Sequence, residues 1–418
     1  MQLLSVRSLA STWFLSVVCF VVSTPAPVLA QPGDKPFPYG QQPIDYFAEP
    51  QADPIAQLGR RIQKGELKLR YTEPHGYLLS LLQALDVPVE SQVLVFSKTS
   101  VNKRLIDPRT PRAIFFNDTV YVGWIPEVPA LEISAIDPQR GAMFYSLPQQ
   151  SDKPPKFKRS ENCLACHATS NSLQVPGQLL RSFSTDKMGN PISGLARVNH
   201  GTPLAKRWGG WYVSGLHGKQ THLGNTFGTE QNRRHRDDPA FGSNVTNLDP
   251  FFNVARYPAA HSDIVALLVL DHQVHAQNLL TRLNYETRLE RKPTVEDELL
   301  RYLFFIDEPP LTDEVLGTSK FADVFESRGP EDPYGRSLRQ FDLKSQLFKY
   351  RLSYQIYSPA FQQLPATAKA RLYKRIWNVL TGKEKQADFR NIPQPGRQEI
   401  LEMLRGTLPD LPAYYRQE

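Results

Sequence analysis

The chain has 418 residues, of which 40% are hydrophobic and 22% are charged. This composition excludes a disordered, fibrous or collagen-like protein and is typical of a globular protein with enough apolar material for a large core. The formal net charge is +7, but the basic residues are scattered along the chain, which does not favour binding to nucleic acid.

The first thirty residues have the layout of a secretory signal peptide. Arg7 precedes an apolar run over residues 13–22, and the stretch ends in small residues at Ala30. This run has about half of the roughly 20 apolar residues that a membrane-spanning helix needs. We therefore expect cleavage near Ala30, export to the periplasm, and a mature chain without a membrane span.

The chain then divides into three further regions. Residues 31–90 predict an N-terminal arm followed by short helices at 55–64 and 77–85. Residues 91–260 contain short runs of β-branched and aromatic residues separated by turn residues, which is the pattern of an antiparallel meander. The expected strands are 93–96, 113–116, 120–125, 131–136, 142–147, 179–184, 192–198 and 211–216, and the polar segment 218–247 is expected to form long loops.

Residues 261–418 change to a helical pattern. Ser262 and Asp263 suit a helix N-cap, and apolar residues at helical spacing predict a long helix over 264–289. Shorter helices are expected at 295–305, 368–380 and 396–404. We expect Asp263, Asp271 and Glu286 to be charges on the surface of the long helix. The predicted fold class is α+β, with a central antiparallel β region followed by a helical C-terminal part.

The two cysteines that remain after signal cleavage, Cys163 and Cys166, are the most informative residues. Their spacing suits a short disulfide, half of a zinc site or a haem attachment. His167 follows directly and completes the sequence Cys163-Leu164-Ala165-Cys166-His167. The two-residue spacer lets both sulfurs reach neighbouring vinyl groups of one porphyrin, and the histidine can then bind the iron. We predict one covalent haem c with His167 as its proximal ligand.

The pentapeptide resembles the attachment site of c-type cytochromes. Here it falls between predicted strands in a chain about four times the length of the small soluble cytochromes c, which are helical and carry the motif near the N-terminus. Together with the segments Arg181-Ser182-Phe183 and Arg207 to Val213, it resembles a group of large exported bacterial single-haem proteins. The resemblance implies haem c and export, and it leaves the fold and the reaction open.

The sixth iron position decides between an electron carrier and a catalyst. The alternatives are a histidine, a methionine, or an open or water-filled site. The candidate ligands are His272, His217, His222, His200 and Met188. The other two methionines of the mature chain, Met143 and Met403, are expected in the core.

An aromatic cluster beside glycines offers candidate haem contacts. Trp208 and Trp211 suit one face of a porphyrin, and Arg207 or Arg181 suits pairing with a haem propionate. The alternative is an aromatic-rich strand within the core.

The function that the sequence favours is electron transfer through the haem iron, with another redox protein as partner. A haem enzyme, peroxidase-like or another oxidoreductase, is the alternative with an open iron site, because the chain is much longer than a carrier requires. A gas-binding haem sensor is a further alternative. Zinc binding through Cys163, Cys166 and two histidines is the last.

Overall fold

The computed structural model describes residues 36–49, 52–392 and 394–416. The predicted signal peptide, residues 1–30, lies outside these described residues. Residues Phe37–Glu418 form one compact unit.

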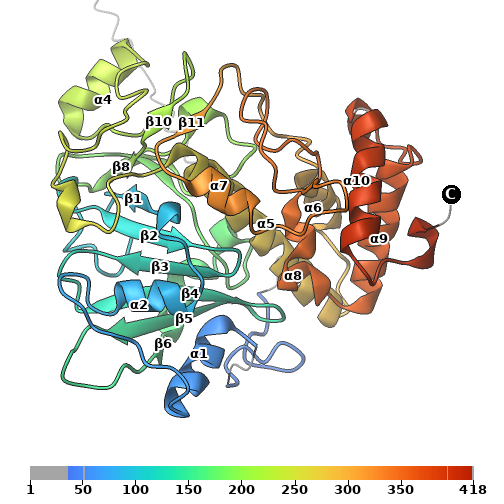
Figure 1. Ribbon diagram of the computed structural model, residues 1–418, viewed down its shortest axis with the longest axis horizontal. Helices are drawn as coiled ribbons and strands as arrows, with labels where there is room; N and C mark the ends of the chain where they lie inside the picture. The colour runs from blue at the N-terminus through green and yellow to red at the C-terminus, as the bar shows by residue number, and fades with distance from the viewer. Residues whose placement is uncertain (1–35, 50–51, 393, 417–418) are drawn as a thin grey trace, which may run out of the picture. The chain divides into compact units, whose positions relative to one another are not determined.

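A seven-stranded antiparallel sheet organises the β-rich region, in the order β6-β5-β4-β3-β2-β1-β9 (Figure 1). Consecutive strands lie side by side from β1 to β6, so the predicted antiparallel meander is confirmed. The strands of the sheet are β1 (Val93–Val95), β2 (Arg112–Phe116), β3 (Val120–Trp124), β4 (Ala130–Asp137), β5 (Gly141–Pro148), β6 (Lys158–Arg159) and β9 (Trp211–Tyr212).

Two small sheets accompany the large one. A hairpin pairs β7 (Ser182–Thr185) with β8 (Pro191–Leu195), and β10 (Gly215–Leu216) pairs with β11 (Leu316–Gly317). The single strand predicted over 211–216 is therefore divided, since β9 belongs to the large sheet and β10 to a small one.

One face of the large sheet is covered by the N-terminal arm and by helices α1 (Pro54–Gln63) and α2 (Leu78–Ala84). Helix α1 begins where Asp53 accepts hydrogen bonds from two backbone N–H groups of the first turn, at 3.0 Å each. Apolar residues of both helices share a core with the strand residues that point the same way. Both predicted helices are thus present within one or two residues of their expected bounds.

The opposite face is covered by α5 (Ile264–Arg288), the predicted long helix. Asp263 caps it by accepting from the N–H groups of Val265 and Ala266. Every residue of α5 except Arg282, Thr287 and Arg288 is buried. The expectation of surface charges was wrong, because Asp263, Asp271 and Glu286 are all buried, at most 2% exposed. A helix that is buried all round has no solvated side for a charge to occupy.

The C-terminal helices pack with α5 into the larger of the two cores. Figure 1 shows α9 and α10 side by side, at the end of the fold away from the strands. The predicted helices near 295–305, 368–380 and 396–404 are confirmed. The helices of this part are α6 (Glu296–Leu303), α7 (Phe321–Glu326), α8 (Pro359–Gln362), α9 (Ala366–Leu380) and α10 (Gln394–Thr407).

The expectation of loops over 218–247 was wrong in part, because α4 (Gly228–Asp237) lies within it. This helix is polar and mostly exposed, so it has no apolar periodicity to reveal it. Its charges do fit a helix, with Glu230 in the first turn and basic residues in the last turn, where each sign favours the local backbone dipole.

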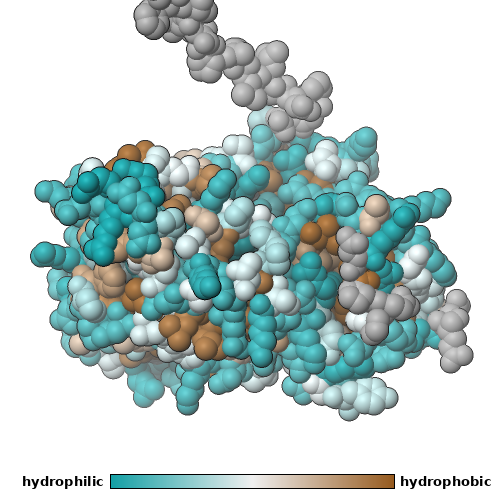
Figure 2. All heavy atoms as spheres, turned by 90° about the horizontal axis from the view of Figure 1, so that it is seen from above, coloured by the Kyte–Doolittle hydropathy of each residue, from teal (hydrophilic) through white to brown (hydrophobic). Residues whose placement is uncertain are grey.

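The observed fold is α+β, as predicted, with the strands in the first part of the chain and most helices in the C-terminal part. Short 3-10 turns connect several elements, at Val89–Ser91, Glu161–Cys163, Ser170–Ser172, Leu204–Lys206, Val254–Arg256, Tyr354–Tyr357, Ala387–Asn391 and Ala413–Tyr415. No helix within the described residues is both long and apolar enough to span a membrane. The face drawn in Figure 2 is mostly hydrophilic, with apolar side chains in small separate patches.

Candidate functional site

The CxxCH sequence forms two consecutive short helical turns directly after the sheet. The 3-10 turn Glu161–Cys163 continues into α3 (Leu164–His167), which places the two cysteines one helical turn apart. Both thiols are free; Cys163 is half-buried and Cys166 is exposed. Leu164, between them, packs against both hydrophobic cores and so fixes the turn on the body of the protein.

The thiol of Cys163 is held in place by its surroundings. Its Sγ donates to the hydroxyl of Ser160 at 3.5 Å. Burial raises the pKa of this thiol, and the hydrogen bond to Ser160 only partly opposes the shift. The sulfur therefore stays protonated at neutral pH.

His167 is oriented by the backbone of Gly177. Its Nδ1 lies 2.9 Å from the Gly177 carbonyl oxygen, and the N–H of Gly177 donates to the carbonyl of His167 at 2.9 Å. A carbonyl only accepts, so Nδ1 carries the ring proton and Nε2 keeps the lone pair. Burial lowers the pKa of His167 to about 4, although the bond to Gly177 opposes the shift. The ring is therefore neutral at physiological pH and in the tautomer that metal ligation through Nε2 requires.

The side chains around His167 keep its ring in place. The ring of Phe144 on β5 lies 4.8 Å from that of His167, centroid to centroid. Ser172 donates to the His167 carbonyl at 2.9 Å. A Cβ on Gly177 would lie only 2.2 Å from Oδ1 of Asn278 on α5, so the close approach of this loop to the helix requires glycine.

Two of the four predicted haem contacts lie together, at the far end of the segment that follows the motif. The indole N–H of Trp211 donates to the carbonyl of Arg181 at 2.8 Å. The charge of Arg181 contributes to the lowered pKa of His167, after burial, which is the largest cause. Trp211 itself is buried in the core.

The other two predicted contacts, Arg207 and Trp208, meet at Asp271 of α5. Arg207 binds the carboxylate at 3.0 Å and Trp208 donates its indole N–H at 3.1 Å. Arg207 also donates to the carbonyls of Thr202 and His200, at 2.6 and 2.5 Å. Its guanidinium is thus engaged inside the core, and no described contact brings Arg207 or Trp208 to the motif. Burial raises the pKa of Asp271 to about 6 despite these partners.

In His217 and His222, two of the predicted distal ligands, one ring nitrogen already accepts a hydrogen bond and the other carries the proton, so neither nitrogen offers a free lone pair to iron. The N–H of Asn244 donates to Nε2 of His217 at 3.1 Å, and the N–H of Gly224 donates to Nδ1 of His222 at 3.0 Å. The remaining nitrogen of each neutral ring must then carry the proton. Both of these nitrogens are buried without a hydrogen-bond partner among the described residues.

His272 and His200, the next two distal candidates, face each other through their Nδ1 atoms at 2.8 Å. The Nε2 of His272 also contacts the Ser353 hydroxyl at 2.6 Å, which occupies both of its ring nitrogens. The Nε2 of His200 is buried and has no partner within the described part of the chain. Among the described residues, no hydrogen bond or ring contact joins either histidine to Cys163, Cys166 or His167.

The methionine candidate, Met188, lies in the turn between β7 and β8, and 47% of its surface is exposed. Asp186 accepts from its backbone N–H and so fixes the turn rather than the side chain. Met143 and Met403 are fully buried, as expected.

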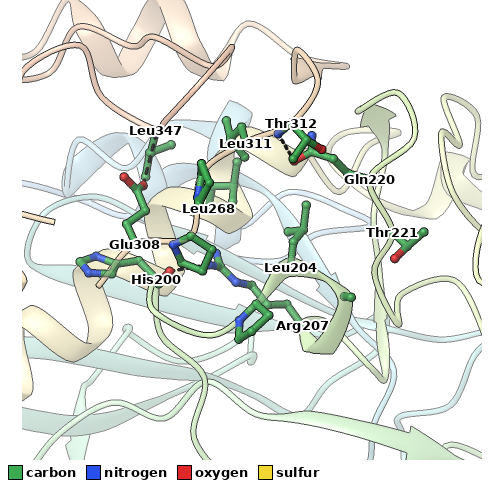
Figure 3. A pocket seen from close by; sticks show the side chains of 14 residues that line it. His200, Leu204, Arg207, Gln220, Thr221, Leu268, Glu308, Leu311, Thr312 and Leu347 are labelled. Atoms are coloured by element: carbon green, nitrogen blue, oxygen red, sulfur yellow. Dashed lines mark hydrogen bonds between the residues drawn. The ribbon is translucent and has the colours of Figure 1, made fainter. Parts of the chain in front are cut away.

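A cavity of about 230 Å³ lies beside His200 and Arg207 (Figure 3). Its walls are mostly apolar, and Leu268 of α5 is one of them. Glu308, at its edge, accepts from Arg351 at 2.8 Å, so both charged groups of this lining have partners elsewhere. The motif residues are not part of the lining.

Sequence reasoning missed the residues that orient the motif. Gly177 acts through its backbone carbonyl, and only the Pro176-Gly177 pair marked a turn at this place. Phe144 lies in a correctly predicted strand, but its position beside His167 depends on strand register, which the sequence pattern did not specify.

Residues 36–49, 52–392 and 394–416 contain no group of three or more His, Cys, Asp or Glu side chains arranged to hold a metal ion. A haem does not depend on such a group, because its porphyrin supplies the equatorial iron ligands and the protein supplies axial ones. No protein-family model, no curated protein and no solved structure matches this chain.

Proposed function

We propose that this protein is an exported c-type cytochrome with a single covalent haem, and that its function is electron transfer. The observation that supports this most is the state of the motif, with two free thiols one turn apart and a neutral imidazole whose Nε2 lone pair is available. The independent prediction of a signal peptide agrees with it, since haem c attachment takes place outside the cytoplasm.

Each residue of the motif has a defined role in this proposal. The thiols of Cys163 and Cys166 would hold the haem by adding across its two vinyl groups, each sulfur bonding to one vinyl carbon while its thiol proton passes to the other. His167 would bind the iron through Nε2, while the Gly177 carbonyl accepts from Nδ1 and holds the imidazole ring in place. The bound haem supplies a one-electron couple between ferrous and ferric iron.

The neighbourhood of the motif also fits a porphyrin. The Nε of Arg112, on the sheet face beside the motif, is buried and has no acceptor among the described residues. An unpaired N–H of this kind is costly unless an acceptor is supplied. A haem carboxylate has the charge that suits it. The partner in this proposal is another redox protein.

The test is production in a bacterial host that matures c-type cytochromes. The mature protein should weigh one haem more than the polypeptide and show the absorption bands of haem c after reduction. Cys163→Ser and Cys166→Ser should each lose one thioether bond, and their double variant should lose covalent haem altogether. A wild-type product with the mass of the bare polypeptide would disprove the proposal.

A matched histidine control separates ligation from general damage. His235 also points Nδ1 at a carbonyl, that of Phe241, at 3.0 Å. His167→Ala should change the reduced spectrum, whereas His235→Ala should leave it unchanged. Carbon monoxide then distinguishes a carrier from the alternatives, because a spectrum that the gas shifts indicates an open sixth site, as an enzyme or a gas sensor requires.

A further inference from the structure

One part of the large sheet remains half open, on the same face that α5 covers. We call this part the open strip and define it as Arg112, Ile114, Gly123 and Glu132. Ile114, Gly123 and Glu132 are direct partners across β2, β3 and β4. All four residues are partly exposed, whereas Phe116, Tyr121 and Ser134, the next residues on this face towards α5, are buried.

The segment that carries the motif borders the open strip. His167 lies against Phe144 of β5, the side chain of Gln178 donates to Ser134 of β4, and Trp211 of β9 binds the carbonyl of Arg181. The segment therefore crosses this face from β5 to β9. The side chain of Asn278 on α5 accepts from the backbone N–H of Gln178 at 3.0 Å and donates to the Gln178 carbonyl at 2.9 Å. Helix α5 therefore lies along one side of the segment.

A fixed ion pair lies within the open strip. Arg112 and Glu132 meet at 2.7 Å, with side-chain exposures of 18% and 24%. Ser100 and Asn102 also donate to Glu132, at 2.6 and 2.7 Å. Burial raises the pKa of Glu132, but Arg112 and these two donors outweigh it, so the pKa falls below its ordinary value and the carboxylate stays charged.

The motif packs on the same face as the open strip. Cys163 and Leu164 join the core to which Ile114 of the open strip also belongs. His167 packs on Phe144, whose direct partner on β4 is Ser134, two residues from Glu132 on the same face. The ion pair therefore lies on the sheet face against which the proposed iron ligand packs.

We infer that the haem attached at Cys163 and Cys166 lies over the open strip, and that the ion pair between Arg112 and Glu132 sets the reduction potential of its iron. This inference rests on the proposed function. A fixed negative charge near the iron favours the ferric state and a positive charge favours the ferrous state. The carboxylate lowers the potential, and the guanidinium offsets part of that effect.

The charge test compares two neutralised variants of the haem-loaded protein by redox titration at low salt. Glu132→Gln should raise the midpoint potential and Arg112→Gln should lower it, each measured on the fraction of the variant that carries covalent haem. Asp297→Asn is the control, because it removes an exposed carboxylate that is paired with Arg375 in the C-terminal helices. Unchanged potentials in both variants, or shifts in the same direction, would overturn the inference.

A steric test is independent of charge. A Cβ on Gly123 would lie 3.5 Å from Glu132 and 3.6 Å from Arg112, which is ordinary contact, so the strand accepts a side chain there. Gly123→Leu should fold, by circular dichroism, but bind haem poorly or with shifted absorption bands. Gly396→Leu, on α10 with open space around it, is the matched control. Normal haem content and an unchanged spectrum in Gly123→Leu would overturn the placement.

These outcomes are distinguishable from failure of the proposed function. A wild-type protein without covalent haem disproves the proposed function, and the inference falls with it. If the wild-type protein carries haem but either the charge test or the steric test gives its overturning result, the inference alone is disproved.

Discussion

The buried ion pair between Arg207 and Asp271 makes the sharpest stability prediction. Asp271 is fully buried and its pKa of about 6 lies about two units above its ordinary value, so its ionised form is disfavoured by about 3 kcal/mol even with Arg207 in place. Replacing Arg207 by Met removes the ion pair and the hydrogen bonds to the carbonyls of Thr202 and His200. A buried charge left without its partner typically costs about 3–5 kcal/mol, and we expect Arg207→Met to cost this much at pH 8.

The loss of unfolding free energy in Arg207→Met should depend on pH, because Asp271 titrates in this range. A raised pKa in the folded state means that folding favours the protonated carboxyl, so this contribution to stability falls as pH rises. Without Arg207 the pKa of Asp271 rises further, and at pH 5 the folded variant holds the proton. We expect Arg207→Met to cost at least about 1 kcal/mol less at pH 5 than at pH 8.

Urea unfolding followed by tryptophan fluorescence, at both pH values, measures these differences. The double variant Arg207→Met with Asp271→Asn should recover part of the loss at pH 8, because an amide oxygen still accepts from Trp208 and no charge is left unpaired. The control is Arg256→Met at the exposed pair with Glu127, which should cost about 1 kcal/mol or less. If Arg207→Met costs less than this control, or costs the same at both pH values, the reasoning is refuted.

Two further predictions concern acid stability and the loop behind the motif. Burial, with smaller contributions from neighbouring histidines, lowers the pKa of His222 and of His272 to about 3 each. Because only the unfolded chain binds these protons between pH 6.5 and 3, the free energy of unfolding should fall on acidification by up to about 1.4 kcal/mol per pH unit for each ring. Urea titrations at pH 7, 6 and 5 check this: His222→Gln should flatten the slope, and a wild-type stability that does not change over this range would contradict it. Gly177→Ala should cost about 1–3 kcal/mol, since its Cβ would displace Asn278, and should also weaken the orientation of His167, seen as a change in its imidazole NMR signals. An equally stable Gly177→Ala variant with unchanged signals would show that the loop does not pack as described.

The sequence predicted the elements well where one local signal was strong. The apolar run after Asp263 marked α5, and the turn residues between short β-branched runs marked the strands of the meander. Helix α4 escaped because a polar helix has no hydrophobic period, and its charge pattern is a weaker signal.

The site was predictable only as far as its chemistry is local. The identities of Cys163, Cys166 and His167 follow from five consecutive letters. Glu132 could not be found in this way, because its position beside the motif depends on how β4 pairs with its neighbours and on how the later segment crosses them. Asp271 was wrongly expected on the helix surface for a related reason. The partner that allows its burial, Arg207, lies 64 positions away along the chain, and the sequence does not show that the two meet.

Helix α5 has a consequence for how strictly the fold is specified. Several of its buried polar side chains have partners from other parts of the chain: Asp271 binds Arg207 and Trp208, Gln277 binds Tyr121, and Asn278 binds Gln178. If the helix were rotated by one residue, all of these side chains would lose their partners at once and remain unpaired in an apolar interior. These pairs therefore fix the rotation of α5 about its own axis. Through Asn278 they also fix the position of the Gly177 loop, which orients His167.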